Sequence, residues 1–186
     1  MRRRTALPTD PNIDEDPTPR IMIYDYHQDD PNKCTAAKLE KFHLAQPLHS
    51  LRQIPHSAIV LNPVSNRTLS FEDRAMIERH GLVALDCSWN LAETTFQENI
   101  RGENRRLPLL LAGNPTNYSS RGRLSTVEAL AAALIITGFD KKAPHILELF
   151  KWGPTFLTLN KEPLQEYSKT PAAKMIDCER TYFPAE

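Results

Sequence analysis

The chain has 186 residues, 25% of them charged, and a formal net charge of +0. This length allows one sizeable core, or two lobes that share one, and the balanced charge excludes a global field that would attract nucleic acid or membrane. Because the charge is balanced, a polyanion site would have to be a local patch. No apolar run approaches the ~18 residues of a membrane span, so we expect no membrane partner.

Residues 1–19 and the cysteines both bear on the compartment. The segment 1–19 begins with Arg2-Arg3-Arg4 and holds four prolines and few apolar groups, which predicts a disordered leader and not a signal peptide. The three cysteines, Cys34, Cys87 and Cys178, are odd in number and widely spaced. That pattern favours free thiols over a disulfide framework or a zinc site, and we expect a cytoplasmic protein.

The predicted elements alternate between strand and helix up to residue 112. Short apolar runs predict strands at 20–24, 58–61, 82–85 and 107–112. Helices are predicted at 35–42 and 70–79, with a short one at 96–100. Thr35 is the expected N-cap of the first helix. Ser70, with Asp73 three residues on, forms a capping-box pattern for the second, which Gly81 should end.

Beyond Asn114 the pattern changes to helices alone. Ser125 opens a strongly apolar helix that Gly138 should end, and two more helices are predicted at 144–150 and 161–168. Residues after Thr170 are expected to form a loosely held tail. We therefore predict an α/β lobe with a mostly parallel sheet at 20–118, and an all-α lobe at 119–186 packed on it.

Two of the predicted strands end in polar, small and aromatic residues. Asp86-Cys87-Ser88-Trp89 follows the third run, and Gly113-Asn114-Pro115 follows the fourth. Parallel strands bring their carboxyl ends to one edge of a sheet, so these residues predict the mouth of a ligand site. Apolar walls there would suit an adenine held by main-chain groups. The alternative is that Asp86 caps the next turn and Trp89 is ordinary core.

Common catalytic templates are absent from the sequence, but a basic cluster is present. There is no glycine-rich phosphate loop, and the histidines share no metal-ligand spacing with the cysteines, so we expect no metal. Residues 101–123 hold five arginines against one acidic residue, Glu103. Such a rim suits a phosphate backbone, although a solvated face would have the same composition. The candidate RNA-binding residues are Lys33, Lys38, Arg67, Arg101, Arg105, Arg106, Arg121 and Arg123.

Several motifs occur in a characteristic order over residues 20–168. They include Asp30-Pro31-Asn32-Lys33-Cys34-Thr35, Leu61-Asn62-Pro63, Ala84-Leu85-Asp86-Cys87-Ser88-Trp89, Arg106-Leu107-Pro108, Asn114-Pro115-Thr116-Asn117-Tyr118 and Phe150-Lys151-Trp152-Gly153. On these motifs the chain resembles the ribosome-biogenesis aminocarboxypropyltransferases that modify small-subunit ribosomal RNA in archaea and eukaryotes. Ala36, Asn62 and Gly113 depart from the usual pattern, and these departures bear on fine specificity more than on the reaction.

The resemblance implies a SPOUT-like α/β lobe whose chain threads a deep trefoil knot, followed by the helical lobe. It implies transfer of the 3-amino-3-carboxypropyl group of S-adenosylmethionine, a co-substrate, to a hypermodified uridine or pseudouridine of small-subunit rRNA. The partner would be that rRNA or a pre-ribosomal particle. We expect a monomer, because the helical lobe would cover the surface by which most SPOUT methyltransferases dimerise. Alternatives are a SPOUT-type rRNA methyltransferase and a non-catalytic ribosome-assembly factor that binds RNA.

The resemblance also assigns residues. Adenine would pack on Leu61, Pro63, Trp89, Leu124 and Ala129. The backbones of Leu107 and Gly122 would bind its edge, and the backbone of Leu85 the ribose. Thr35 and Thr126 would hold the carboxylate end of the transferred group. Asp86 would orient the amino group, or help to deprotonate the acceptor nitrogen, with orientation ranked first.

Overall fold

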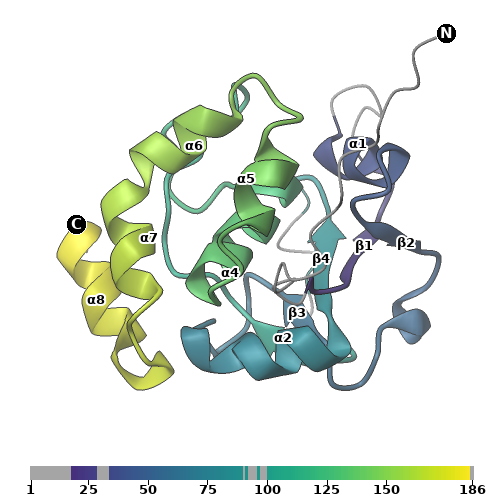
Figure 1. Ribbon diagram of the computed structural model, residues 1–186, viewed down its shortest axis with the longest axis horizontal. Helices are drawn as coiled ribbons and strands as arrows, with labels where there is room; N and C mark the ends of the chain where they lie inside the picture. Colours follow the sequence, from purple (N-terminus) through teal and green to yellow (C-terminus); the bar gives the residue numbers. More distant parts are fainter. Residues whose placement is uncertain (1–17, 29–33, 90, 92–95, 97–99, 185–186) are drawn as a thin grey trace, which may run out of the picture.

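The computed structural model describes residues 18–28, 34–89, 91, 96 and 100–184. Its centre is a five-stranded sheet in the order β2-β1-β4-β3-β5, in which every pair of neighbouring strands is parallel (Figure 1). The strands are β1 (Ile21–Asp25), β2 (Gln46–Leu48), β3 (Ile59–Leu61), β4 (Leu82–Asp86) and β5 (Glu103–Arg105). All five residues of β4, the central strand, are buried. The predicted α/β class with a parallel sheet is confirmed.

The strands alternate between two apolar clusters, one on each face of the sheet. Ile21 and Ile23 of β1 belong to the larger cluster beneath the helices, whereas Met22 between them belongs to the smaller one. Leu82 and Val83 of β4 divide in the same way. This period of two is the geometry of a pleated strand, and burial on both faces explains why these runs are continuously apolar.

The first two helices begin at polar caps. Helix α1 (Thr35–Lys41) is capped by Cys34, whose Sγ accepts a hydrogen bond from the Ala37 amide at 3.3 Å. The prediction of Thr35 as the cap is therefore wrong by one residue. The predicted capping box of Ser70 and Asp73 is confirmed; it opens a 3₁₀ turn, η2 (Phe71–Asp73), that continues into α2 (Arg74–His80).

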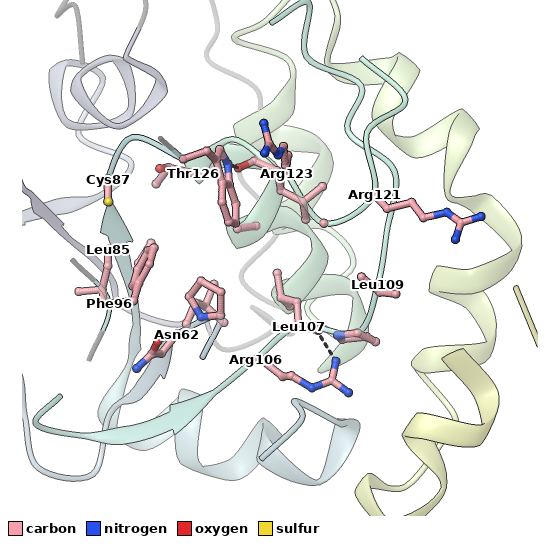
Figure 2. Close-up of a pocket in the computed structure, with 18 of the residues that line it drawn as sticks. Asn62, Leu85, Cys87, Phe96, Arg106, Leu107, Leu109, Arg121, Arg123 and Thr126 are labelled. Atoms are coloured by element: carbon pink, nitrogen blue, oxygen red, sulfur yellow. Dashed lines mark hydrogen bonds between the residues drawn. The ribbon is translucent and has the colours of Figure 1, made fainter. Parts of the chain in front are cut away.

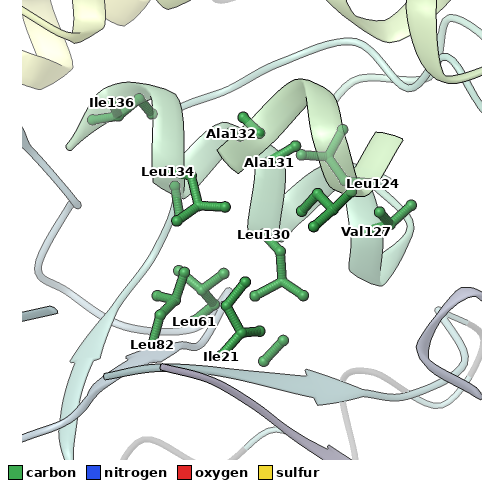
Figure 3. Close-up of a cluster of buried hydrophobic side chains, with 14 of the residues drawn as sticks. Ile21, Leu61, Leu82, Leu124, Val127, Leu130, Ala131, Ala132, Leu134 and Ile136 are labelled. Carbon is green, nitrogen blue, oxygen red and sulfur yellow. The ribbon is translucent and has the colours of Figure 1, made fainter. Parts of the chain in front are cut away.

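Helix α4 (Thr126–Ile136) lies at the centre of the larger core (Figure 3). Ser125 and Glu128 form a full capping box at its start. The helix is buried on nearly all sides because it contacts β4, α1, α5 and α7. Leu130 and Leu134 are fully buried, and burial of a leucine side chain is worth roughly 1.5–3 kcal/mol. This packing attaches the helical part of the chain to the sheet.

The remaining helices are α5 (Lys142–Leu147), α6 (Gly153–Leu159), α7 (Lys161–Tyr167), the 3₁₀ turn η3 (Ala172–Lys174) and α8 (Met175–Tyr182). Of these, α5 lies beside α4 near the middle of the molecule, and α6, α7 and α8 run along one side of it (Figure 1). Sequence patterns did not predict α6 or α8. The expectation of a loosely held tail after Thr170 is wrong, because Met175 is fully buried and Glu179 is ion-paired to Arg106.

The predicted strand at 107–112 is also wrong. This segment is extended, but its link to a neighbouring segment is an isolated antiparallel bridge between Leu111 and Arg121. The fifth position in the sheet belongs to β5, four residues earlier. The short edge strand β2, which contains Pro47, gave no clear sequence signal.

Other expectations stay predictions. Residues 97–99 of the expected short helix and 1–17 of the expected leader lie outside the described residues. The division into two lobes at 118, the SPOUT-like lobe and the trefoil knot are likewise predictions. Among the helices that the structure describes, none has the length and apolar character needed to cross a membrane.

Candidate active site

A cavity of about 460 Å³ opens at the carboxyl ends of β3 and β4 (Figure 2). Its volume falls in the ~300–1,000 Å³ range of small-molecule sites. The walls come from the ends of these two strands, from the extended segment after β5, from residues 121–124, from α4 and from α8. The lining residues are Leu61, Asn62, Pro63, Ala84, Leu85, Cys87, Trp89, Phe96, Arg106, Leu107, Pro108, Leu109, Arg121, Gly122, Arg123, Leu124, Thr126, Ala129 and Glu179.

The structure brings nine of the ten expected cofactor-binding residues into this one cavity. They are Leu61, Pro63, Leu85, Trp89, Leu107, Gly122, Leu124, Thr126 and Ala129. Thr35 is the exception, because it lies outside the lining. Sequence reasoning missed Phe96, Leu109 and Glu179 as lining residues. What each residue would bind remains a prediction, but these residues form one surface.

Trp89 is held in a fixed orientation at the cavity wall. Its indole Nε1 donates a hydrogen bond to the Leu124 carbonyl at 2.9 Å. This bond links the loop after β4 to the turn before α4, two segments that both line the cavity. An indole fixed at its polar edge leaves its apolar face available for stacking.

The backbone near Leu107 and Gly122 has the features of a main-chain binding edge. Gly122 has a φ of +71°, a left-handed conformation that glycine adopts at little cost, and its amide donates to the Leu110 carbonyl at 2.8 Å. Within the part of the chain that the structure describes, the Leu107 amide has no hydrogen-bond partner. An unpaired amide in a cavity wall is a donor available to a ligand.

Asp86 ends β4 and is buried, with 7% of the residue exposed. The Cys34 thiol donates to its Oδ2 at 3.0 Å, and the Thr126 hydroxyl donates to its Oδ1. Burial, with a further contribution from Asp86, raises the pKa of the Cys34 thiol to about 12. The thiol is therefore protonated at neutral pH and acts as a hydrogen-bond donor.

Asp25 is the register partner of Asp86 on the neighbouring strand β1. Ligand atoms of Asp25, Cys34 and Asp86 all lie within 4.8 Å of one another, a spacing that a metal ion could span. In this structure the Cys34 thiol donates a hydrogen bond to Asp86, so Cys34 and Asp86 belong to one hydrogen-bonded network.

Thr35 lies next to this network. Its hydroxyl accepts a hydrogen bond from the Val127 amide at 3.3 Å, which joins the start of α1 to the first turn of α4. Thr35 and Thr126, the two residues expected to hold a carboxylate, are thus on adjoining helix starts on either side of Asp86.

The expected RNA-binding residues divide into separate groups. Arg121 and Arg123 are exposed and line the cavity, and Arg67 and Arg101 are exposed elsewhere. In Figure 2 the Arg121 side chain extends away from the cavity centre. Its guanidinium carbon lies 5.9 Å from the centre of the Phe183 ring. Arg67 forms an exposed ion pair with Glu103 at 2.9 Å. Lys33 lies outside the described residues.

The expectation that Arg105 binds RNA is wrong. Only 3% of this residue is exposed, and its guanidinium pairs with the buried Asp73 at 3.0 Å. A phosphate could not reach it without opening the core. Lys38 also has internal partners, since its Nζ donates to the Leu149 carbonyl and lies 4.7 Å from the centre of the Phe150 ring. The free basic rim is therefore smaller than the sequence suggested.

The fold and the cavity define an α/β protein with an apolar small-molecule site at the carboxyl edge of a parallel sheet. Residues 59–183 match the family described as "Ribosome biogenesis protein, C-terminal", and the chain belongs to this family. Residues 19–52 match the description "Possible Fer4-like domain in RNase L inhibitor, RLI". That stretch contains one cysteine, Cys34, which does not fit the four cysteine ligands of an iron–sulfur cluster.

Named relatives agree with the family predicted from the motifs. The chain is 45% identical over 152 residues to a 16S rRNA aminocarboxypropyltransferase of Vulcanisaeta distributa, covering 81% of this chain and 82% of that protein. A relative of the same name from Methanosphaera stadtmanae is 43% identical over 151 residues, covering 81% and 88%. The solved structure of the SAM-dependent rRNA:acp-transferase Tsr3 from Vulcanisaeta distributa matches with a TM-score of 0.79 and 42% identity, covering 86% of this chain and 88% of that one.

Proposed function

We propose that this protein transfers the 3-amino-3-carboxypropyl group of S-adenosylmethionine to a uridine or pseudouridine of small-subunit rRNA during ribosome maturation. The observation that carries the proposal is the cavity, because residues from five separate stretches of the chain that the family resemblance assigns to one ligand line a single apolar site. The printed names of the relatives, 16S rRNA aminocarboxypropyltransferase, support the same activity.

The adenosine would occupy the apolar part of the cavity. Its base would pack on Leu61, Pro63, Trp89, Leu124 and Ala129. The Leu107 amide, which has no partner among the described residues, and the Gly122 backbone would bind the edge of the base, and the Leu85 backbone the ribose. An apolar slot with a few main-chain polar groups suits the flat, weakly polar face of adenine.

The 3-amino-3-carboxypropyl arm of S-adenosylmethionine would extend toward Asp86. Thr35 would bind its carboxylate through the hydroxyl and Thr126 through the backbone amide, because the Thr126 hydroxyl donates to Asp86. Asp86 would bind the ammonium group of the arm. Both oxygens of Asp86 already accept hydrogen bonds, from Cys34 and from Thr126, which fixes the direction of the carboxylate. A fixed anion suits orientation of a cation better than proton transfer, so we assign Asp86 to orienting the ammonium group.

Every carbon attached to a sulfonium is electrophilic, so the product depends on which carbon faces the acceptor in line. The acceptor nitrogen would attack the methylene carbon of the arm. The N–C bond forms as the C–S bond breaks, and the electron pair of the broken bond stays on sulfur, which leaves neutral methylthioadenosine. The nitrogen proton passes to solvent or to a neighbouring base. An apolar wall packed against the methyl group would keep the methyl carbon away from the acceptor nitrogen.

The rRNA would approach over the exposed arginines at the mouth, Arg121 and Arg123, with Arg67 and Arg101 as further candidates. These side chains would contact phosphates, which supply affinity without sequence specificity. Recognition of the target nucleotide would come from the shape of the cavity mouth.

Finer expectations belong to the same proposal. We expect a trefoil knot in a SPOUT-like lobe; the placement of β4 between the earlier strands β1 and β3 is compatible with such threading. Mechanical unfolding from the two termini tests this, since a tightened knot shortens the extended chain and an unknotted chain reaches full contour length. We also expect a cytoplasmic monomer that needs no metal. Sedimentation at several protein concentrations tests the monomeric state, and activity assays with a chelator test whether a metal is needed.

The deciding experiment uses S-adenosylmethionine labelled either in its methyl carbon or in its carboxyl carbon, with unmodified small-subunit rRNA as acceptor. Carboxyl label in the RNA, together with methylthioadenosine release, is the expected result. Methyl label alone in the RNA would instead identify a methyltransferase. Absence of S-adenosylmethionine binding by calorimetry would leave only an RNA-binding assembly factor.

A further inference from the structure

The extended segment 107–112 forms one wall of the cavity, and side chains of the C-terminal helices hold its backbone. The Leu109 amide donates to Glu179 Oε2 at 2.9 Å, and the Tyr167 hydroxyl donates to the Leu109 carbonyl at 3.1 Å. The Asn160 side chain bonds both the amide and the carbonyl of Leu111, each at 2.8 Å. The position of this wall therefore depends on residues from α7, α8 and the junction between α6 and α7.

Glu179 makes the ionic contact in this arrangement. Its side chain is 12% exposed and lines the cavity, and the same Oε2 that binds the Leu109 amide lies 2.8 Å from Arg106 Nη1. Arg106 in turn donates from Nη1 to the Leu107 carbonyl at 3.2 Å, the contact drawn in Figure 2. One carboxylate thus fixes the chain on both sides of Leu107-Pro108. Charge-assisted hydrogen bonds of this kind are stronger than neutral ones.

We propose that Glu179 is a positioning residue for the adenosine site, acting through Arg106 and the Leu109 amide to set the place of the Leu107 backbone. The inference rests on the proposed function, because it is the adenine of S-adenosylmethionine that the Leu107 amide would bind. It assigns Arg106 to the cofactor wall and removes it from the RNA-binding rim. It also gives α8 a role in the site, although that helix is remote from the strands in sequence.

The test measures the affinity for methylthioadenosine, which has the adenosine but not the transferred arm, and for S-adenosylmethionine. Removal of a hydrogen-bonded charge in Glu179→Ala should weaken both ligands by the same factor, on the order of tenfold. Glu179→Gln keeps an acceptor for Leu109 but loses the ion pair, and should show a smaller loss. In steady-state assays the KM for S-adenosylmethionine should rise in both variants while kcat at saturation stays within about twofold.

The matched control is Asp177→Ala, an acidic side chain on the same helix that is 82% exposed. It should leave both affinities unchanged. Arg106→Ala should weaken methylthioadenosine binding without changing the salt dependence of RNA binding. If Glu179→Ala does not fold, the affinities of Glu179→Gln, the milder change, decide whether the inference holds.

Equal affinities of wild type and Glu179→Gln for methylthioadenosine would overturn the inference, as would a loss confined to kcat or to RNA binding. The proposed function is tested separately by the wild-type protein. If wild type binds neither nucleoside, the proposed function fails. If it binds both and Glu179→Gln binds them equally well, only the inference about Glu179 fails.

Discussion

The thiol of Cys34 lies 3.0 Å from Asp86 Oδ2 and, through the same sulfur, caps helix α1. One atom therefore couples the start of a helix to the carboxyl end of the central strand. Burial raises the pKa of this thiol to about 12, so it donates a hydrogen bond and does not act as a nucleophile at neutral pH. Its role in the proposed reaction is to hold the Asp86 carboxylate in place.

We expect Cys34→Ser to retain activity, because a hydroxyl can replace the thiol both as donor and as helix cap. Cys34→Ala removes both interactions and should lower kcat/KM by roughly tenfold, since one net hydrogen bond is worth about 1 kcal/mol and the cap a similar amount. Single-turnover assays with labelled S-adenosylmethionine measure this. The same loss in Cys34→Ser and Cys34→Ala would contradict the donor role.

The raised pKa of Cys34 also predicts a difference in alkaline stability. Between the ordinary thiol pKa of 9.0 and about 12, the unfolded chain loses the Cys34 proton while the folded protein keeps it. The unfolded state then binds fewer protons, so the free energy of unfolding falls as pH rises through this window. Cys34→Ser does not titrate there and should lose less stability. Urea titrations of both proteins at pH 8 and pH 10.5 compare them, and identical losses would contradict the assignment.

Local signals in the sequence predicted part of this structure correctly. Ser70 with Asp73 is a capping pattern that spans four residues, and the box forms. Ser125 opens α4 as predicted, and the structure adds a second box in which Glu128 takes part. The runs at β1, β3 and β4 are apolar because both faces of the parallel sheet are covered. The residues that end β3 and β4 meet at one edge and line the cavity, as the rule predicts. Gly113-Asn114-Pro115, predicted as the other half of the mouth, lies outside the lining, and Gly113 and Asn114 bind Glu128.

The errors involve partners that are distant in the chain. The run at 107–112 is apolar enough for a strand, but its backbone is bound by Asn160, Tyr167 and Glu179, which are 49, 58 and 70 residues further on. Arg105 and Arg106 are neighbours of the same type, but Arg105 is buried against Asp73, 32 residues earlier, whereas Arg106 pairs with Glu179, 73 residues further on. Helix α8 is mostly polar, and its core contacts, Met175, Cys178 and Tyr182, follow helical spacing over only eight residues, too short a run to identify the helix.

Arg105 should contribute to stability and not to RNA affinity. Arg105→Ala leaves Asp73 buried without its cation, and loss of one partner from a buried ion pair typically costs about 3–5 kcal/mol. A lower midpoint in urea is therefore expected. Arg67→Ala, which breaks an exposed pair with Glu103, should cost at most about 1 kcal/mol and serves as the control. A midpoint for Arg105→Ala as high as that of the control would contradict the buried pair.

Trp89 should contribute to cofactor affinity. Trp89→Ala removes much of an aromatic face, and we expect a loss of about 2–3 kcal/mol in the binding of S-adenosylmethionine. Trp89→Phe keeps an aromatic ring but loses the hydrogen bond to Leu124, so it should bind with intermediate affinity. Calorimetry on variants with unchanged circular dichroism measures both. Phe42→Ala, at an exposed aromatic residue on the end of α1, is the control. Wild-type affinity in a folded Trp89→Ala would place the indole outside the site.

Arg121 and Arg123 should carry the electrostatic part of RNA binding, because both are exposed at the mouth of the cavity. The double substitution to alanine should weaken binding and reduce the slope of log affinity against log salt by roughly 1–2, about one unit for each phosphate that is no longer neutralised. Arg79→Ala, an exposed arginine on α2, is the control, and its slope should match wild type. Affinity for methylthioadenosine should be unchanged in the double variant, which separates the RNA rim from the adenosine wall that Arg106 and Glu179 hold. A salt slope equal to that of wild type would move the RNA path away from this mouth.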